Sequence, residues 1–156
     1  MLKLRQFDDN DIELFTRWVY APHVAKWYHE PLNWIYEIEH RNAEYSWINH
    51  FIVEYDGIFI GFCQFYEYSK GGEDWHGDIE IDGTYSIDYL IGEPEFLGQK
   101  LGKEIIISLC DLIKTHDNAK RIIVQPENEN KASCGVLLSC GFKYDEKNSL
   151  YILELI

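Results

Sequence analysis

Residues 87–103 read IDYLIGEPEFLGQKLGK, and this stretch decides the fold class. It begins as a strand that is apolar or aromatic apart from Asp88, and a turn containing Gly92 and Gly98 follows. A helix begins near Leu101, and its apolar stripe is formed by Ile105, Ile106, Leu109, Leu112 and Ile113. Unpaired amides at a helix N-terminus, beside glycines that allow close approach, suit a pyrophosphate, although the same spacing also occurs in ordinary tight connections.

Outside this stretch, periodicity and turn residues predict the order strand, two helices, three strands, helix, strand, helix, two strands. Asp56-Gly57 predicts a hairpin turn, Asn130 a helix cap and Gly141 the end of that helix. We expect one long strand over residues 79–91, with Asp82-Gly83 as a point where it can bend, and a loop at Pro31. The chain is therefore predicted to be α/β, with a mixed sheet of about seven strands flanked by about four helices in a single domain, residues 1–156.

The charge is strongly acidic and unevenly distributed. The formal net charge is −13, and residues 67–96 hold nine acids and one base. This excludes nucleic acid and anionic membranes as expected partners, since both require a large basic patch. Aromatic residues are interleaved with the acids, and the two together can hold a cationic ligand by cation–π contact and ion pairing. The alternative is a solvated acidic face.

The remaining composition argues against several classes of protein. No apolar run approaches the length that spans a bilayer, so we expect a soluble, cytoplasmic protein. The four cysteines lack Cys-x-x-Cys spacing and predict reduced thiols. The six histidines form no pair at metal-ligand spacing, so we predict no metal.

A second motif, NKASCGVLLSCGF at residues 130–142, follows a strand ending in Val124-Gln125-Pro126. Together with the first motif, it resembles the GNAT superfamily of N-acetyltransferases. Further residues are similar to the aminoglycoside 6'-N-acetyltransferase branch, namely Phe7, Trp18, Pro22-His23-Val24, Trp27, Gly61-Phe62-Cys63-Gln64 and the run from Ile87-Asp88 to Gly98. The likeness covers nearly the whole chain.

The resemblance implies acetyl-CoA as cofactor and assigns residues to each part of a site. The implied cofactor-binding residues are Leu90, Ile91, Leu97, Gly98, Gln99, Lys100, Leu101, Gly102, Lys103, Asn130 and Ser133. The implied acceptor-binding residues are Trp27, Gln64, Tyr66, Asp74, Trp75 and Asp88. Asp88 is also the implied catalytic residue. Because an exposed aspartate has a pKa of about 3.9, we expect it to serve chiefly as an anchor and to accept a proton late or through water.

Two positions depart from the family pattern. Lys100 stands where the phosphate loop usually has its middle glycine, and Leu137 stands where many members have a tyrosine that protonates the departing thiol. Tyr144 or Tyr66 could replace that tyrosine.

The predicted function is acetyl transfer from acetyl-CoA to a primary amine of a small, aminoglycoside-like polycation, by a monomer or homodimer. Three alternatives stay open. One is acetylation of a polyamine or of a protein or peptide. A second is a non-catalytic module of this fold that binds CoA, and a third is a partner-binding protein with an exposed aromatic patch.

Overall fold

The computed structural model describes residues 1–155, and its centre is one seven-stranded sheet in the order β1-β2-β3-β4-β5-β7-β6. The strands are β1 (Leu2–Gln6), β2 (Ile48–Tyr55), β3 (Ile58–Glu67), β4 (Thr84–Ile91), β5 (Arg121–Val124), β6 (Lys143–Asp145) and β7 (Leu150–Glu154). The α-helices are α1 (Ile12–Tyr20), α2 (Pro22–Ala25), α3 (Pro31–Glu39), α4 (Leu101–Lys114) and α5 (Lys131–Ser139). The predicted α/β class and mixed sheet are confirmed, with five α-helices in place of about four.

Two local predictions are wrong. Pro31 begins α3 rather than a loop, because proline at the first helical position is pre-organised for the helix and loses no needed hydrogen bond. The strand expected over residues 79–91 begins only at Thr84. Gly83, at φ +78°, turns the chain, and its carbonyl accepts hydrogen bonds from the amides of Lys120 and Arg121.

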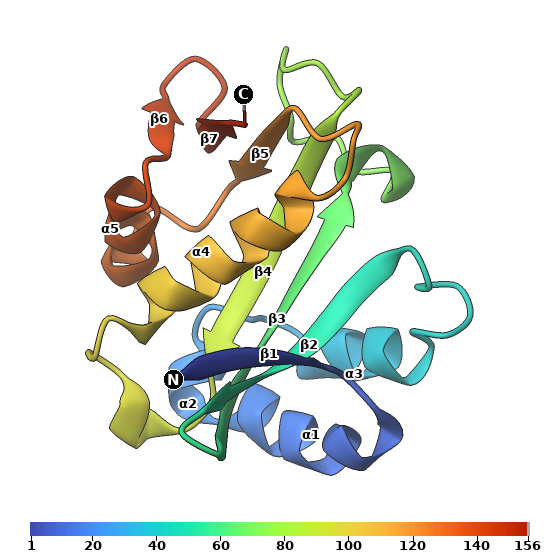
Figure 1. Cartoon of the computed structure of the whole chain (residues 1–156), viewed down its shortest axis with the longest axis vertical. Coiled ribbons are helices and arrows are strands. Elements are labelled where there is room, and N and C mark those ends of the chain that lie inside the picture. Colours follow the sequence, from blue (N-terminus) through green and yellow to red (C-terminus); the bar gives the residue numbers. More distant parts are fainter. Residues whose placement is uncertain (156) are drawn as a thin grey trace.

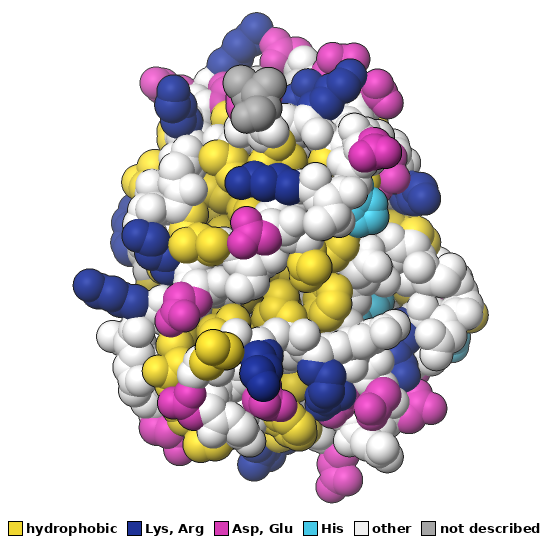
Figure 2. All heavy atoms as spheres, viewed as in Figure 1, with side chains coloured by type: hydrophobic (Ala, Val, Ile, Leu, Met, Phe, Trp, Pro, Cys, Tyr) yellow, Lys and Arg dark blue, Asp and Glu magenta, His cyan; other side chains and the backbone are white. Residues whose placement is uncertain are grey.

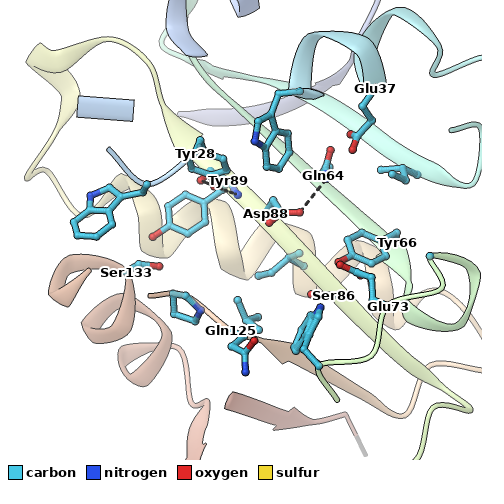
Figure 3. Close-up of a pocket in the computed structure, with 18 of the residues that line it drawn as sticks. Tyr28, Glu37, Gln64, Tyr66, Glu73, Ser86, Asp88, Tyr89, Gln125 and Ser133 are labelled. Atoms are coloured by element: carbon cyan, nitrogen blue, oxygen red, sulfur yellow. Dashed lines mark hydrogen bonds between the residues drawn. The ribbon is translucent and has the colours of Figure 1, made fainter. Parts of the chain in front are cut away.

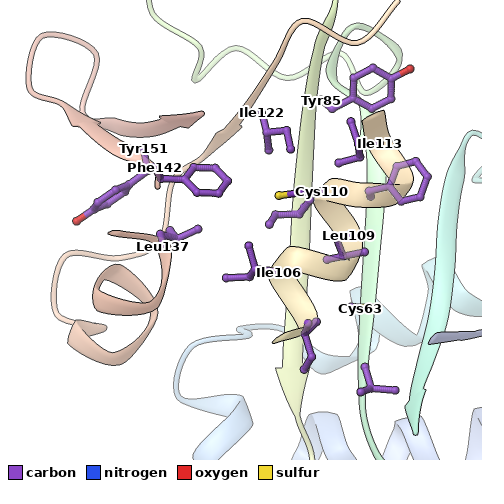
Figure 4. Packing of buried hydrophobic residues seen from close by; sticks show 14 of the residues in the cluster. Cys63, Tyr85, Ile106, Leu109, Cys110, Ile113, Ile122, Leu137, Phe142 and Tyr151 are labelled. Atoms are coloured by element: carbon purple, nitrogen blue, oxygen red, sulfur yellow. The ribbon is translucent and has the colours of Figure 1, made fainter. Parts of the chain in front are cut away.

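The sheet is covered on both faces, by α4 on one and by α1 to α3 on the other (Figure 1). Alternation along β4 separates the two cores, since successive side chains point to opposite faces. Ile87 packs into the cluster whose members Ile106 and Leu109 of α4 are labelled in Figure 4. Leu90 packs instead with Trp18 of α1.

The two central strands β4 and β5 are parallel but pair over only two residues, Thr84 with Arg121 and Tyr85 with Ile122. Beyond Tyr85 the strands separate, and β4 continues to Ile91 without a strand partner on that side. On its other side β4 is paired with β3 along the range from Tyr85 to Ile91. The second half of β4 therefore presents backbone N–H and C=O groups at an internal edge.

The surface over α4 mixes both charges. On this face Lys and Arg side chains are interspersed with Asp and Glu, and apolar side chains lie between them (Figure 2). Within residues 1–155, no helix combines the length and the apolarity that crossing a membrane requires.

Candidate active site

A cavity of about 620 Å³ opens beside the separated half of β4. Its walls come from α3, β3, β4, α5 and the loops between them (Figure 3). The aromatic residues that line it are Trp27, Tyr28, Trp34, Tyr45, Trp47, Tyr66, Trp75 and Tyr89. Carboxylates from four separate segments, Glu37, Glu73, Asp88 and Glu127, are also among the lining residues. An aromatic cavity with several carboxylates suits a cationic ligand.

Asp88 lies half-buried on β4, directly opposite Gln64 on β3. The Gln64 side-chain amide donates a hydrogen bond from Nε2 to Asp88 Oδ2 over 2.9 Å. Burial raises the pKa of Asp88 to about 7, with smaller contributions from the charges of Glu37 and Glu73, while the Gln64 hydrogen bond opposes the rise. The expectation of an exposed, strongly acidic aspartate is therefore wrong. A carboxyl group with a pKa near neutrality suits a general base.

Tyr66 and Glu73 form the wall of the cavity that lies away from Tyr89 and Ser133 (Figure 3). The Tyr66 hydroxyl donates to Glu73 Oε1 over 2.7 Å, and burial raises the pKa of that phenol well above its usual value. The edge of the Trp47 ring packs against Tyr66, with ring centroids 5.5 Å apart. This wall therefore combines one carboxylate with aromatic surface.

The structure brings together four of the predicted acceptor-binding side chains besides Asp88: Trp27, Gln64, Tyr66 and Trp75 all line the cavity. Asp74 does not, and its side chain is exposed outside it. The acidic loop turns at this point, so that Glu73 faces the cavity while the next residue faces solvent. The position of Asp74 therefore gives no support to its predicted role in the acceptor site.

Glu37 is a lining carboxylate that sequence reasoning missed. It lies on α3 and accepts a hydrogen bond over 2.9 Å from Nε2 of His50, which is on β2. The only available signal was the spacing of Trp34 and Glu37, which are one helical turn apart and both line the cavity. Without α3 in the predicted elements, that spacing had no meaning.

The internal edge of β4 is partly occupied by side chains. The Tyr28 hydroxyl donates to the Tyr89 carbonyl and accepts from the Tyr89 amide, and His23 Nε2 donates to the Ile91 carbonyl over 3.0 Å. Backbone groups along a strand alternate between its two neighbours, so Leu90, between these two residues, faces β3. The prediction that Leu90 offers its backbone to a cofactor is corrected: the groups on the open side belong to Tyr89 and Ile91.

The start of α4 has the features of an anion site. Gly98 and Lys100 both have left-handed backbone conformations, at φ +76° and φ +62°, and no side chain caps the helix. Within residues 1–155, the amides of Gly98, Gln99 and Lys100 have no hydrogen-bond acceptor. A Cβ atom at buried Gly102 would lie 3.3 Å from the Tyr89 ring, so glycine at this position lets that ring pack closely against the start of the helix. Free amides on a turn with left-handed residues fit a pyrophosphate.

The amino-acid sequence matches a family model over residues 8–150, nearly the whole chain, and that model describes an acetyltransferase (GNAT) domain. The chain belongs to the GNAT family. This confirms the resemblance seen in the two motifs, and with it the prediction of an N-acetyltransferase that depends on acetyl-CoA.

Solved GNAT structures share the fold closely. The aminoglycoside acetyltransferase AAC(6')-Ib in complex with coenzyme A superposes with a TM-score of 0.84 at 17% identity, covering 99% of this chain and 95% of that one. An aminoglycoside N(6')acetyltransferase from Legionella pneumophila superposes with a TM-score of 0.70 at 20% sequence identity, and the match covers 99% of this chain and 91% of that one. The spermidine N-acetyltransferase from Vibrio cholerae, in complex with CoA and spermine, superposes with a TM-score of 0.72 at 16% sequence identity. The match covers 98% of this chain and 92% of that one. At these identities the likeness establishes the fold.

Within this GNAT fold, Lys100 takes the place of the usual glycine by adopting the left-handed conformation itself, at a cost of roughly 1–2 kcal/mol for a residue with a side chain. The loop therefore keeps the shape that a glycine would give it. Leu97, Gln99, Lys100 and Lys103 belong to this segment or adjoin it, and the side chains of Lys100 and Lys103 are exposed. Phosphate binding is thus compatible with this departure.

The first residues of α5 follow the GNAT pattern. Asn130 caps the helix by accepting from the Ser133 amide over 3.2 Å, and both side chains line the cavity. Leu137 also lines it, so the position of the family's tyrosine holds no acid. Of the two suggested replacements, Tyr144 is exposed and packs on Tyr151, outside the lining.

Tyr89 carries a hydroxyl group in this region, and the sequence analysis did not consider it as a replacement for the missing tyrosine. Its side chain points from β4 toward Ser133 on α5 (Figure 3). Burial raises the pKa of this phenol, and the Ser133 hydroxyl acts in the opposite direction. At this pKa Tyr89 holds its proton near neutral pH.

Proposed function

We propose that the protein transfers an acetyl group from acetyl-CoA to a primary amine of a small polycationic acceptor, with aminoglycosides as the first class to test. The observation that carries this is Asp88, with a pKa of about 7, in an aromatic cavity with three further carboxylates, Glu37, Glu73 and Glu127. The aminoglycoside acetyltransferases among the structural neighbours support the choice.

Asp88 prepares the acceptor amine. An alkylammonium group cannot attack a carbonyl carbon until it loses a proton, and ionised Asp88 both attracts the ammonium and takes that proton on Oδ1 or Oδ2. Gln64 holds the carboxylate in place through its 2.9 Å hydrogen bond. The reaction rate should therefore rise as the pH increases through the pKa of Asp88.

The second half of β4 and the start of α4 would hold the cofactor. Bound acetyl-CoA supplies the acetyl group and a thiol leaving group. The free amides from Gly98 to Lys100, with the ammonium groups of Lys100 and Lys103, would bind its pyrophosphate. The Tyr89 hydroxyl would give a proton to the departing sulfur and regain one from solvent, which would replace the acid missing at Leu137.

A polyamine is the second candidate acceptor, supported by the spermidine N-acetyltransferase among the neighbours and by the aromatic walls of the cavity. Hydrocarbon chains between ammonium groups pack well on indole rings, with the ammonium groups over their faces.

The test is acceptor-dependent release of thiol from acetyl-CoA, with kanamycin-like aminoglycosides, spermidine and a lysine peptide offered in parallel. Release with aminoglycosides alone supports the first proposal, and release with spermidine alone selects the second. If no acceptor raises release above the blank while acetyl-CoA still protects the protein against heat, a CoA-binding module replaces the enzyme as the explanation.

A further inference from the structure

One buried acceptor atom in the cavity has no partner. Gln64 is 2% exposed, and its Oε1 makes no hydrogen bond within residues 1–155, although its Nε2 donates to Asp88. Buried polar atoms are normally paired, because an unpaired acceptor has lost its water without compensation. The atom therefore calls for a hydrogen-bond donor that residues 1–155 do not supply.

The Glu37 carboxylate lies on the same side of the cavity as Gln64 and is held there by a hydrogen bond. Glu37 Oε2 accepts from His50 Nε2 over 2.9 Å, and the two side chains are only 15% and 3% exposed. The other oxygen, Oε1, accepts no hydrogen bond from residues 1–155. His50 thus fixes the direction of the carboxylate and leaves one of its oxygens available to a ligand.

Gln64 Oε1 and the Glu37 carboxylate are directed to the same part of the cavity, away from Asp88 (Figure 3). Two acceptors that share one space require a donor between them, and an ammonium group supplies both positive charge and several N–H bonds. Trp34, one turn before Glu37 on α3, adds an aromatic wall.

Exchanging the positions of the oxygen and nitrogen of the Gln64 side-chain amide does not remove the need for a donor from the ligand. Its NH2 group would then face Glu37, but its carbonyl oxygen would face the Asp88 carboxylate, and that contact is favourable only while Asp88 carries a proton. The reactive enzyme has Asp88 ionised, so in that state the amide donates to Asp88 and Oε1 stays directed toward Glu37.

We propose that Glu37 and Gln64 Oε1 form a subsite for a second cation of the acceptor, distinct from the amine that is acetylated beside Asp88. Glu37 is then a specificity-determining residue and His50 a positioning residue. The inference rests on the proposed acetyl transfer, and it requires that good acceptors carry two cationic groups.

The test compares an α,ω-diaminoalkane with the n-alkylamine of the same chain length. The wild type should use the diamine with the lower KM. Glu37→Gln should raise KM for the diamine roughly tenfold, with kcat changed less than about twofold, and should raise KM for the monoamine much less. The matched control is Glu44→Gln, which also removes one acid but lies on the exposed surface, outside the cavity lining.

His50 provides a second, independent variant. His50→Phe removes the donor and should raise KM for the diamine without lowering kcat, whereas His50→Gln keeps a donor and should restore most of the affinity. A merely structural role would lower activity toward both amines alike. Melting temperatures of all variants show whether each is folded.

The outcomes separate the subsite from the acetyl transfer. Equal KM values for diamine and monoamine, or an unchanged diamine KM in Glu37→Gln, would overturn the subsite while acetyl transfer stands. If neither amine releases thiol, acetyl transfer to such amines fails, and the subsite is judged by heat protection alone. Protection by the diamine that is lost in Glu37→Gln and kept in Glu44→Gln supports it, and protection independent of Glu37 overturns it.

Discussion

The acceptor cavity and the start of α4 have opposite hydrogen-bonding character. On the acceptor side, Glu37, Gln64 and Asp88 present oxygen atoms, whereas at the start of α4 the free amides from Gly98 to Lys100 and two lysines present donors. A chain with a net charge of −13 can therefore still offer a local site to an anion. Net charge therefore governs the attraction of a cationic acceptor, whereas a few backbone amides decide where an anion binds.

Removing the central carboxylate should have the largest effect. We expect Asp88→Asn to lower kcat by roughly 100-fold or more, because the amide cannot accept the proton. The wild-type rate should rise as the pH increases through about 7, the pKa of Asp88, because only the ionised form is a base; this rise should disappear in the variant. A pH profile of thiol release measures both. Asp74→Asn, outside the cavity, is the control, and an equal loss there would show that overall acidity is what matters.

A smaller effect is expected at the hydroxyl that faces α5. Tyr89→Phe should lower kcat by roughly tenfold and leave both KM values unchanged, because a thiol with a pKa of about 8.5 can also leave as the thiolate. Steady-state kinetics at neutral pH test this. The loss should shrink as the leaving thiol is made more acidic in acyl donor analogues, and a constant loss would argue against proton donation by Tyr89.

On the donor side, Lys100→Gly separates backbone shape from charge. Glycine should raise the melting temperature, because it removes the left-handed strain at φ +62°. It should also weaken CoA binding several-fold, because the ammonium is lost. Calorimetric titration with CoA gives the second quantity, and Lys114→Gln at the opposite end of α4 is the charge control. Tighter CoA binding by Lys100→Gly would mean that the ammonium does not contact phosphate.

The smallest effect is expected at Tyr28, which lines the acceptor cavity and bonds the open backbone edge of β4. Tyr28→Phe leaves the Tyr89 amide and carbonyl without their present partner, which should cost about 1 kcal/mol in the free energy of unfolding. If the cofactor uses those backbone groups, acetyl-CoA should raise the melting temperature more in the variant than in the wild type. An identical rise in both would place the cofactor elsewhere along β4.

Local features of the fold were predictable because they depend on neighbours in sequence. Asp56 and Gly57 form the expected hairpin turn with positive φ at both residues, and Asn130 caps α5 with its side chain as expected. The helix α3 was not predicted, since prolines favour both loops and helix starts. Its misassignment hid Glu37, and with it one wall of the acceptor cavity.

The sequence by itself determined the family, the mixed sheet and the donor-rich start of α4, because a strand, a glycine turn and a helix that follow one another place their backbone groups locally. The tertiary structure alone decided the pKa of Asp88, the exclusion of Asp74 and the meeting of Glu37 with Gln64. Burial and charge interactions depend on which distant segments come together, and β3, α3 and β4 bring these residues into one cavity.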